Sequence, residues 1–126
     1  MTITEVAEQY GMSADTIRYY ERIGLIPTVN RRPNGIRDFT ETDCNWVAFS
    51  KCMRSAGLSI ESLIEYVTMF QQGDSTVDAR KHLLIEQRDE LAARIKTMED
   101  TLERLNAKID SYEERILKYE DEKLRP

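Results

Sequence analysis

A heptad repeat in the second half of the chain limits the possible folds more than any other feature. Between residues 84 and 119, apolar residues recur at alternating steps of four and three positions, and Arg88 is the one polar residue in the series. This spacing predicts one long helix over residues 76–126 that pairs with a second helix along an apolar seam. The seam residues are Leu84, Leu91, Ile95, Met98, Leu102, Leu105, Ile109, Tyr112, Ile116 and Tyr119.

The length of the seam indicates what it pairs with. At about 1.5 Å per residue, residues 84–119 extend over roughly 50 Å, which is more than the small preceding domain can cover. We therefore predict a homodimer held by a coiled coil. The charges beside the seam would pair best in a parallel dimer. They are Arg94, Lys108 and Arg115 on one flank and Glu99, Glu113 and Glu120 on the other.

The first part of the chain predicts short helices. Thr2 and Glu5 have the spacing of a capping box, and Gly11 follows as a helix breaker. Ser13 then suits the N-cap of a second helix of about three turns that ends at Gly24. A short helix, a glycine turn and a second helix with arginines on one face form a candidate helix-turn-helix.

The segment from residue 25 to residue 39, here called the wing, is polar and basic at its centre. Residues 25–29 and 35–39 are expected to pair as short strands around the central loop. Asn34 and Gly35 supply the turn, because both tolerate a positive φ. Phe39 is expected to pack beneath the wing.

Two more helices are expected after the wing. Thr40 and Asp43 form a second capping box, from which a helix should run to about Ser55. Ser59 caps a further helix that reaches about Phe70. The expected fold class is therefore mainly α, with a winged helix-turn-helix DNA-binding domain over residues 1–75 and a long C-terminal coiled-coil dimerisation helix over residues 76–126.

The arginines of the second helix and the wing predict a nucleic-acid interface. Between residues 16 and 37 the chain has five arginines and one acidic residue, although its net charge is −5. Guanidinium groups bind phosphates and guanine edges, and hydroxyl groups bind phosphate oxygens. A helix-turn-helix that binds only protein, or a coiled-coil adaptor, is the alternative. The expected contacts to double-stranded DNA are Ser13, Thr16, Arg18, Tyr19, Tyr20 and Arg22 on the helix and Arg31, Arg32, Asn34, Gly35 and Arg37 on the wing.

Composition and motifs argue against a membrane protein, a disulfide-rich protein and an enzyme. No apolar run approaches the length of a membrane span and the N-terminus has no signal-peptide pattern, so a cytoplasmic protein without membrane contact is expected. Cys44 and Cys52 predict free thiols in place of a disulfide framework. The sequence has neither a catalytic constellation nor a phosphate-binding loop, so an enzyme is not expected.

Three stretches together resemble the MerR family of transcriptional regulators. They are residues 16–26, with the sequence TIRYYERIGLI, and residues 35–39 and 54–61. The resemblance implies an antiparallel dimer, against the parallel pairing that the charges favour. It also implies that the dimer binds an inverted-repeat promoter site, bends and untwists that DNA, and meets RNA polymerase there. Family members usually carry tyrosine where Phe39 stands, so a phenol contact to phosphate is not expected.

The resemblance also bears on the signal that such a regulator senses. Metal-sensing relatives place cysteines near the end of the long helix, and this chain has none after Cys52. His82 is the single histidine and cannot supply a metal site, so neither a metal nor a cofactor is expected. Drug-sensing relatives append a C-terminal ligand domain, whereas the sequence here stops at Pro126.

Residues 49–57 resemble the thiol-based aldehyde and electrophile sensors of the family, the AdhR and NmlR type. This resemblance implies that Cys52 is the sensing thiol, and Lys51 and Arg54 are close enough in sequence to favour its nucleophilic thiolate. A buried, inert cysteine is the alternative, and the regulator would then have another effector or none. Cys44 precedes Cys52 by about 12 Å along one helix, which argues against a disulfide between them.

Overall fold

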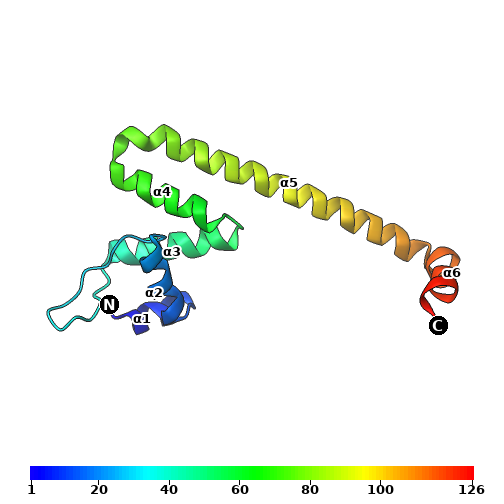
Figure 1. The fold of residues 1–126 in the computed structure, drawn as a ribbon, viewed down its shortest axis with the longest axis horizontal. Helices are drawn as coiled ribbons and strands as arrows, with labels where there is room; N and C mark the ends of the chain where they lie inside the picture. Colours follow the sequence, from blue (N-terminus) through cyan, green and yellow to red (C-terminus); the bar gives the residue numbers. More distant parts are fainter. The chain divides into compact units, whose positions relative to one another are not determined.

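The computed structural model describes residues 1–126, and its regular structure is helical (Figure 1). It divides into two units, Met1–Arg88 and Asp89–Pro126, which we call the head and the tail. The mainly α fold class is confirmed. The main helices are α1 (Ile3–Tyr10), α2 (Ala14–Ile23), α3 (Glu41–Ser55), α4 (Ile60–Gln72) and α5 (Val77–Asp110), and a 3₁₀ turn at Asp74–Thr76 precedes α5.

The first two helices begin at the predicted caps. The Thr2 hydroxyl accepts a hydrogen bond from the Glu5 N–H (3.3 Å), and the Glu5 carboxylate accepts one from the Thr2 N–H (3.0 Å). The Ser13 hydroxyl accepts a hydrogen bond from the Thr16 N–H (3.0 Å) at the start of α2. Gly11 follows α1 with a φ of 63°, in the left-handed region that favours glycine. The predicted helix-turn-helix is confirmed.

The next two helices also follow the sequence signals. Thr40 and Asp43 form the second capping box, and α3 ends at Ser55. At the start of α4, the Ser59 hydroxyl accepts a hydrogen bond from the Ser62 N–H (3.1 Å). Both predicted helices are therefore confirmed.

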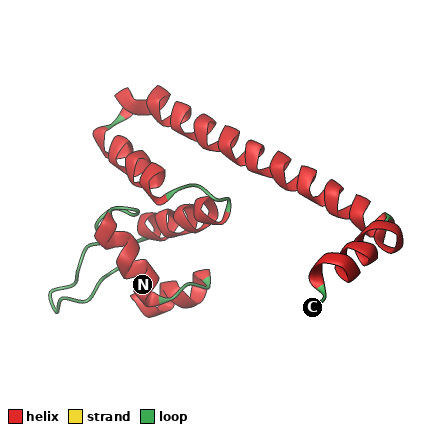
Figure 2. Cartoon of the chain, turned by 45° about the vertical axis from the view of Figure 1, so that its right-hand side comes forward, coloured by secondary structure: helices red, strands yellow, loops and turns green.

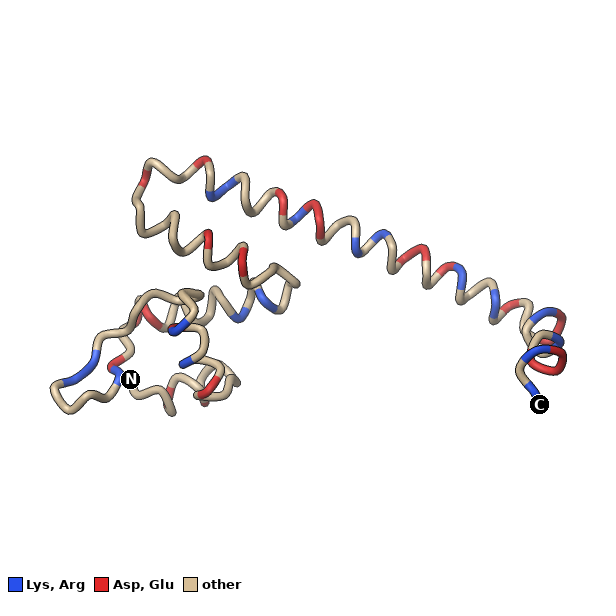
Figure 3. The backbone as a smooth tube through the Cα atoms, in the orientation of Figure 1, with Lys and Arg blue, Asp and Glu red and all other residues tan.

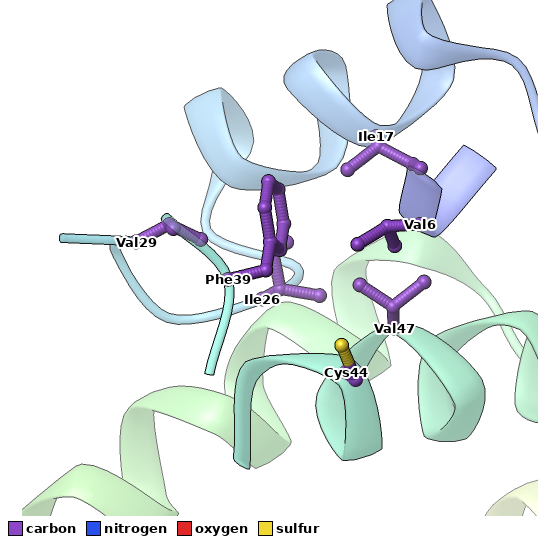
Figure 4. Close-up of a cluster of buried hydrophobic side chains, with 7 residues drawn as sticks. All are labelled: Val6, Ile17, Ile26, Val29, Phe39, Cys44 and Val47. Atoms are coloured by element: carbon purple, nitrogen blue, oxygen red, sulfur yellow. The ribbon is translucent and has the colours of Figure 1, made fainter. Parts of the chain in front are cut away.

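A hydrophobic cluster joins α1, α2, the wing and α3 (Figure 4). Its side chains point toward one another from segments that are far apart in the sequence. Phe39 is only 3% exposed, so its predicted packing beneath the wing is confirmed. Three of the seven members belong to the wing, and the core therefore fixes the base of the wing against α2. The members are Val6, Ile17, Ile26, Val29, Phe39, Cys44 and Val47.

The beginning of α5 packs against a second hydrophobic cluster of the head. Leu84, which the heptad pattern assigns to the dimer seam, packs against this cluster within its own chain. Gln87 is 8% exposed, and its side-chain oxygen accepts a hydrogen bond from the Ser59 N–H (3.3 Å). The head thus extends to Arg88, beyond the expected boundary at residue 75. The buried members of the cluster are Leu25, Leu58 and Leu63.

The wing contains no strand pair (Figure 2). A single antiparallel bridge joins Arg31 to Arg37. The prediction that residues 25–29 pair with residues 35–39 is wrong, because the backbone hydrogen bonds across the wing lie closer to its tip. There the Arg32 N–H donates to the Ile36 carbonyl, and the Asp38 N–H donates to the Asn30 carbonyl (both 2.8 Å). The wing is therefore a loop with a fixed base.

The tail does not form the single helix that the heptad pattern predicts through residue 126. α5 ends at Asp110, and the break falls at Ser111, with φ −105° and ψ 22°. The Ser111 hydroxyl donates to the Ala107 carbonyl (3.0 Å), a contact that competes with the backbone hydrogen bonds of a helix. The segments beyond the break are π-helical turns at Tyr112–Ile116 and Glu120–Leu124 and the short α6 (Leu117–Tyr119) between them.

Most seam residues of the tail are exposed in the single chain. Met98 is 72% exposed, and Ile109 is 61% exposed. A stripe of large apolar side chains left open to water is what one half of a coiled coil looks like without its partner. The exposed seam residues are Ile95, Met98, Leu102, Leu105, Ile109, Tyr112 and Tyr119, whereas Leu91 and Ile116 are half-buried.

Candidate nucleic-acid interface

Arginines from α2 and the wing surround one hollow on the surface of the head. The hollow has a volume of about 420 Å³ and contains four of the five predicted DNA-binding arginines. Figure 3 shows the basic stretch that the wing contributes. An anion that enters the hollow can be bound by several guanidinium groups, which form strong charge-assisted hydrogen bonds with phosphate. The lining residues are Arg18, Glu21, Arg22, Thr28, Arg31 and Arg37.

Glu21 ties the wing to α2 at the edge of this hollow. One carboxylate oxygen accepts a hydrogen bond from Arg37 Nε (2.6 Å), and the other accepts one from the Val29 N–H (2.8 Å). The side chains of Arg37 and Glu21 are 20% and 10% exposed, so water screens this ion pair little. Sequence reasoning assigned Arg37 to DNA contact and did not assign Glu21 any role. The available signal was that Glu21 is the single acidic residue among five arginines.

Two other arginines form exposed ion pairs. Arg18 lies 2.8 Å from Asp15, which precedes it by one turn of α2, and Arg32 lies 3.4 Å from Asp38 on the wing. Exposed pairs of this kind contribute little to stability, because water and salt screen them. Both guanidinium groups can therefore exchange a carboxylate for a phosphate at low cost.

The other side chains that the sequence predicts for DNA contact at α2 lie partly at the surface and partly in the core. The hydroxyls of Ser13 and Thr16 are 2.7 Å apart at the N-cap. Tyr19 is 39% exposed, and the Arg22 guanidinium lies over its ring at 5.3 Å from the centroid. Tyr20 instead packs against both hydrophobic clusters, so its ring contributes to the core.

The tip of the wing is shaped by its own contacts. The Asn34 side-chain oxygen accepts a hydrogen bond from the Ile36 N–H (3.1 Å), and Gly35 has a φ of 85°. Arg31 donates to the Gly35 carbonyl (2.9 Å), across the turn. Asn34 and Gly35 therefore form the predicted turn, which presents Arg31 and the neighbouring Arg32 at the surface.

The other end of the wing is joined to the start of the chain. The Met1 amino group donates to the Phe39 carbonyl (2.8 Å) and lies 3.4 Å from Asp38 Oδ1. Hydrogen bonds from this amino group and from Arg32 hold the pKa of Asp38 below its ordinary value. The charge of Asp38 is thereby stabilised at neutral pH.

The two cysteines lie in different environments. Cys44 is buried in the first cluster, and burial raises the pKa of its thiol. Cys52 is exposed on α3. Since a thiolate reacts only where an electrophile can reach it, Cys52 is the accessible thiol of the pair.

The two cations that flank Cys52 in the sequence are engaged elsewhere. The Lys51 ammonium donates to the Tyr10 carbonyl at the end of α1. Arg54 donates to the Leu58 carbonyl (2.6 Å) after the end of α3. Of the three residues that the sequence predicts for sensing, Cys52 has an exposed thiol, and the two cations bind backbone carbonyls.

The structure was also searched for a metal site and for a membrane-spanning helix. No three histidine, cysteine or acidic side chains converge in a way that would hold a metal ion, and His82 is exposed. No helix of the structure is both long enough and apolar enough to cross a membrane.

Comparisons with known families match the head and most of α5. Residues 1–69 match the family described as "MerR HTH family regulatory protein", and residues 45–108 match that described as "MerR, DNA binding". The chain is 58% identical over 91 residues to the HTH-type transcriptional regulator AdhR of Bacillus subtilis (strain 168). This alignment spans 72% of the present chain but 65% of that regulator, just under two thirds of its length.

Solved structures agree with these matches. A crystal structure of a MerR family transcriptional regulator from Listeria monocytogenes has a TM-score of 0.83 and 48% identity, and the comparison covers 97% of this chain and 92% of that one. HiNmlR, described as a MerR family regulator lacking the sensor domain and bound to promoter DNA, has a TM-score of 0.76 and 30% identity over 89% of both chains. The proteins matched are transcriptional regulators and not enzymes.

Proposed function

This chain belongs to the MerR family of DNA-binding transcriptional regulators, and from this premise we propose that it acts as a homodimer on an inverted-repeat promoter site. The observation that carries the proposal is the hollow in which Arg18, Arg22, Arg31 and Arg37 meet. The arginines of α2 suit base edges in the major groove, whereas those at the tip of the wing suit the phosphate backbone beside it.

The homodimer is supported by the exposed seam of the tail. Burying an apolar side chain of the size of Leu102 or Ile109 contributes about 1.5–3 kcal/mol, so several such residues stabilise a dimer before ordering costs are subtracted. We propose the antiparallel arrangement, because the family resemblance implies it. Two-fold symmetry then requires an inverted repeat with half-sites on successive major-groove faces.

The proposed output is a change in DNA shape that RNA polymerase reads at the promoter. Bending a site of promoter length costs on the order of 1–6 kcal/mol, so a small change in the geometry of the dimer is enough to alter the shape of the bound DNA. A bent and untwisted site can then change transcription while the regulator stays bound.

The proposed input is an aldehyde or related electrophile that reacts with Cys52. Its support is the accessibility of the thiol and the similarity to AdhR. A second candidate is a regulator with another effector, or none, in which Cys52 does not react. Cys52 is not the buried cysteine of the sequence-based alternative, because its side chain is exposed. The positions of the Lys51 and Arg54 cations favour this second candidate, because both bind backbone carbonyls.

A gel-shift assay with a salt titration tests the DNA-binding part of the proposal. We expect tight binding to an inverted-repeat promoter fragment, with an affinity that falls steeply as salt rises because phosphate contacts release counterions. Binding to the promoter no tighter than to unrelated DNA would contradict specific regulation. Binding that ignores salt would contradict the arginine-lined hollow as the DNA site.

A further inference from the structure

The charges beside the seam of α5 limit how two copies of this helix can align. The alignment concerns the antiparallel homodimer proposed above and therefore rests on that proposal. α5 is continuous from Val77 to Asp110, and its seam residues from Ile95 onward are exposed. The seam alone accepts several alignments that differ by whole heptads, because each of them sets apolar residues against apolar residues.

The two-fold symmetry of an antiparallel pair determines which charges meet. Each flank of the seam faces the same flank of the other copy. The flank with Arg94 and Lys108 therefore faces its own copy, and so does the flank with Glu99. Like charges that face each other repel. Charge repulsion can therefore select one alignment among those that the seam allows.

One alignment sets every charged flank residue of the paired region opposite a neutral residue. In this alignment most of α5 lies against its copy, so the exposed seam residues of the helix face the partner's seam. The facing pairs, each with one member from each chain, are Leu91 with Leu102 and Ile95 with Met98 in the seam, and Arg94 with Thr101, Lys108 with Gln87 and Glu99 with Ala92 on the flanks.

The other alignments have repulsive pairs or a shorter interface. A shift of one heptad toward the N-terminus brings Arg94 close to the partner's Arg94. A shift of one heptad toward the C-terminus sets Glu99 against the partner's Glu99 and Arg94 against the partner's Lys108. A second shift in that direction leaves only about four turns of α5 paired, because the helix ends at Asp110. A second shift toward the N-terminus leaves Ile109 beyond the start of the partner's α5.

We propose that α5 pairs with the α5 of a second copy in the alignment that sets Leu91 opposite the partner's Leu102. The two-fold axis then passes between Lys96 and Thr97. Arg94 and Glu99 determine this alignment by making the neighbouring ones repulsive, which is a common way for a coiled coil to specify one pairing. Flank charges that favour a parallel pair when read alone are thus compatible with an antiparallel one.

Disulfide cross-linking of the full-length chain tests this alignment. Cys44→Ala and Cys52→Ser first remove the two native thiols. Adding Leu91→Cys and Leu102→Cys together should then give a covalent dimer on oxidation, because a disulfide needs Cα atoms about 4.4–6.8 Å apart and these positions face each other. Either cysteine alone should give no covalent dimer, since its two copies lie about 16 Å apart along the helix axis.

Leu91→Cys with Ile109→Cys is the matched control, because these positions face each other only after a shift of one heptad toward the C-terminus. Cross-linking by this control or by either single cysteine would overturn the proposal. A non-covalent dimer of the Leu91 and Leu102 double variant that does not cross-link would also overturn it. Sedimentation of the parent protein separates the two levels of the proposal, because a monomeric parent would contradict the homodimer itself.

A charge placed on the flank tests the same alignment with the native cysteines present. Thr101→Glu sets a carboxylate opposite the partner's Arg94 twice per dimer and should lower the dissociation constant of the dimer about three- to fivefold. Sedimentation equilibrium in enough urea to dissociate part of the parent dimer measures this constant. Thr97→Glu adds the same charge at an exposed position outside the seam and should have little effect.

Arg94→Gln provides the cross-check, since Thr101→Glu should give no gain in that background. A weaker dimer of Thr101→Glu would overturn the proposal, because Thr101 faces its own copy in the alignment shifted by one heptad toward the C-terminus. An equal gain with and without Arg94 would overturn it as well.

Discussion

Glu21 joins α2 to the wing through its contacts with Arg37 and the Val29 N–H. We expect Glu21→Gln to lower the free energy of unfolding by about 1–3 kcal/mol, because an amide leaves the mostly buried Arg37 charge uncompensated. Chemical denaturation followed by circular dichroism measures the change. Glu8→Gln, at an exposed position of α1, is the matched control and should change stability little. An equal loss of unfolding free energy in both variants would mean that the ion pair between Glu21 and Arg37 does not stabilise the fold.

Cys44 and Cys52 should differ in reactivity in the folded protein. Burial limits access to Cys44 and raises the pKa of its thiol, so less thiolate is present there at a given pH. With iodoacetamide near pH 8, we expect mass spectrometry to find the label first on Cys52. Both cysteines should react in denaturant. Faster labelling of Cys44 in the native protein would show that the burial of the core has been misassigned.

The residues that sequence reasoning placed correctly act over short distances along the chain. The cap of Thr2 on Glu5 is a contact between residues three positions apart, and such spacing can be read directly. The pairing of Glu21 with Arg37 spans sixteen positions and depends on where the wing folds back. No local pattern encodes that contact, so Arg37 was read as a free DNA-binding cation.

At the scale of elements, α2 and the wing should make separable contributions to DNA binding. If Arg18 meets a base edge, Arg18→Ala should weaken binding to the cognate site by about 1–3 kcal/mol and leave unrelated DNA nearly unaffected. Arg31→Ala at the tip of the wing should weaken binding to all sequences alike and flatten the salt dependence. Gel shifts on cognate and unrelated duplexes at several salt concentrations measure both effects. Unaltered binding by both variants would place the DNA surface elsewhere.

The helices of the head were predictable because the capping residues and the apolar spacing indicate the same helix boundaries. The wing was harder to predict, because Ile26 and Val29 are as suitable for a strand as for a core. Both side chains are buried against α1, α2 and α3, and the backbone of this segment does so without a strand partner. The break at Ser111 could not be predicted from the sequence, because a single serine hardly changes the heptad pattern on either side of it.

At the scale of the whole molecule, a repeat identifies an apolar stripe but not its partner. Leu84 continues the series of the tail, yet it packs against the second cluster of the head within the same chain. Met98 and Leu102 remain exposed and need a different partner. We therefore propose that residues 91–119 form the dimerising part of the seam, a shorter range than the repeat predicts.

The seam can be tested by placing charges in it. Leu102→Glu combined with Leu105→Glu should convert the dimer into monomers, because two carboxylates per chain cannot be buried against the partner helix at acceptable cost. Sedimentation velocity measures the oligomeric state, and operator binding should weaken with it. Arg104→Glu alters the net charge by the same amount at a position outside the seam and should remain dimeric. A double variant that stays a stable dimer would contradict dimerisation through the heptad seam.

The coupling between Cys52 and promoter shape is the prediction that involves the whole dimer. Addition of the Cys52 thiolate to an aldehyde carbonyl adds bulk to α3, which follows the wing and packs with α4. A resulting shift of the two heads relative to each other would change the shape of the bound DNA more than the affinity for it. We therefore expect methylglyoxal to change transcription strongly while operator affinity changes little.

Promoter output with and without methylglyoxal, measured in two cysteine variants, decides this prediction. Cys52→Ser should fold and bind the operator but give no response, because a hydroxyl at this position is a poor nucleophile at neutral pH. Cys44→Ala should still respond, since Cys44 is buried in the core and its thiol takes no part in the proposed reaction. A full response in Cys52→Ser would exclude the thiol mechanism and leave a regulator that senses another effector.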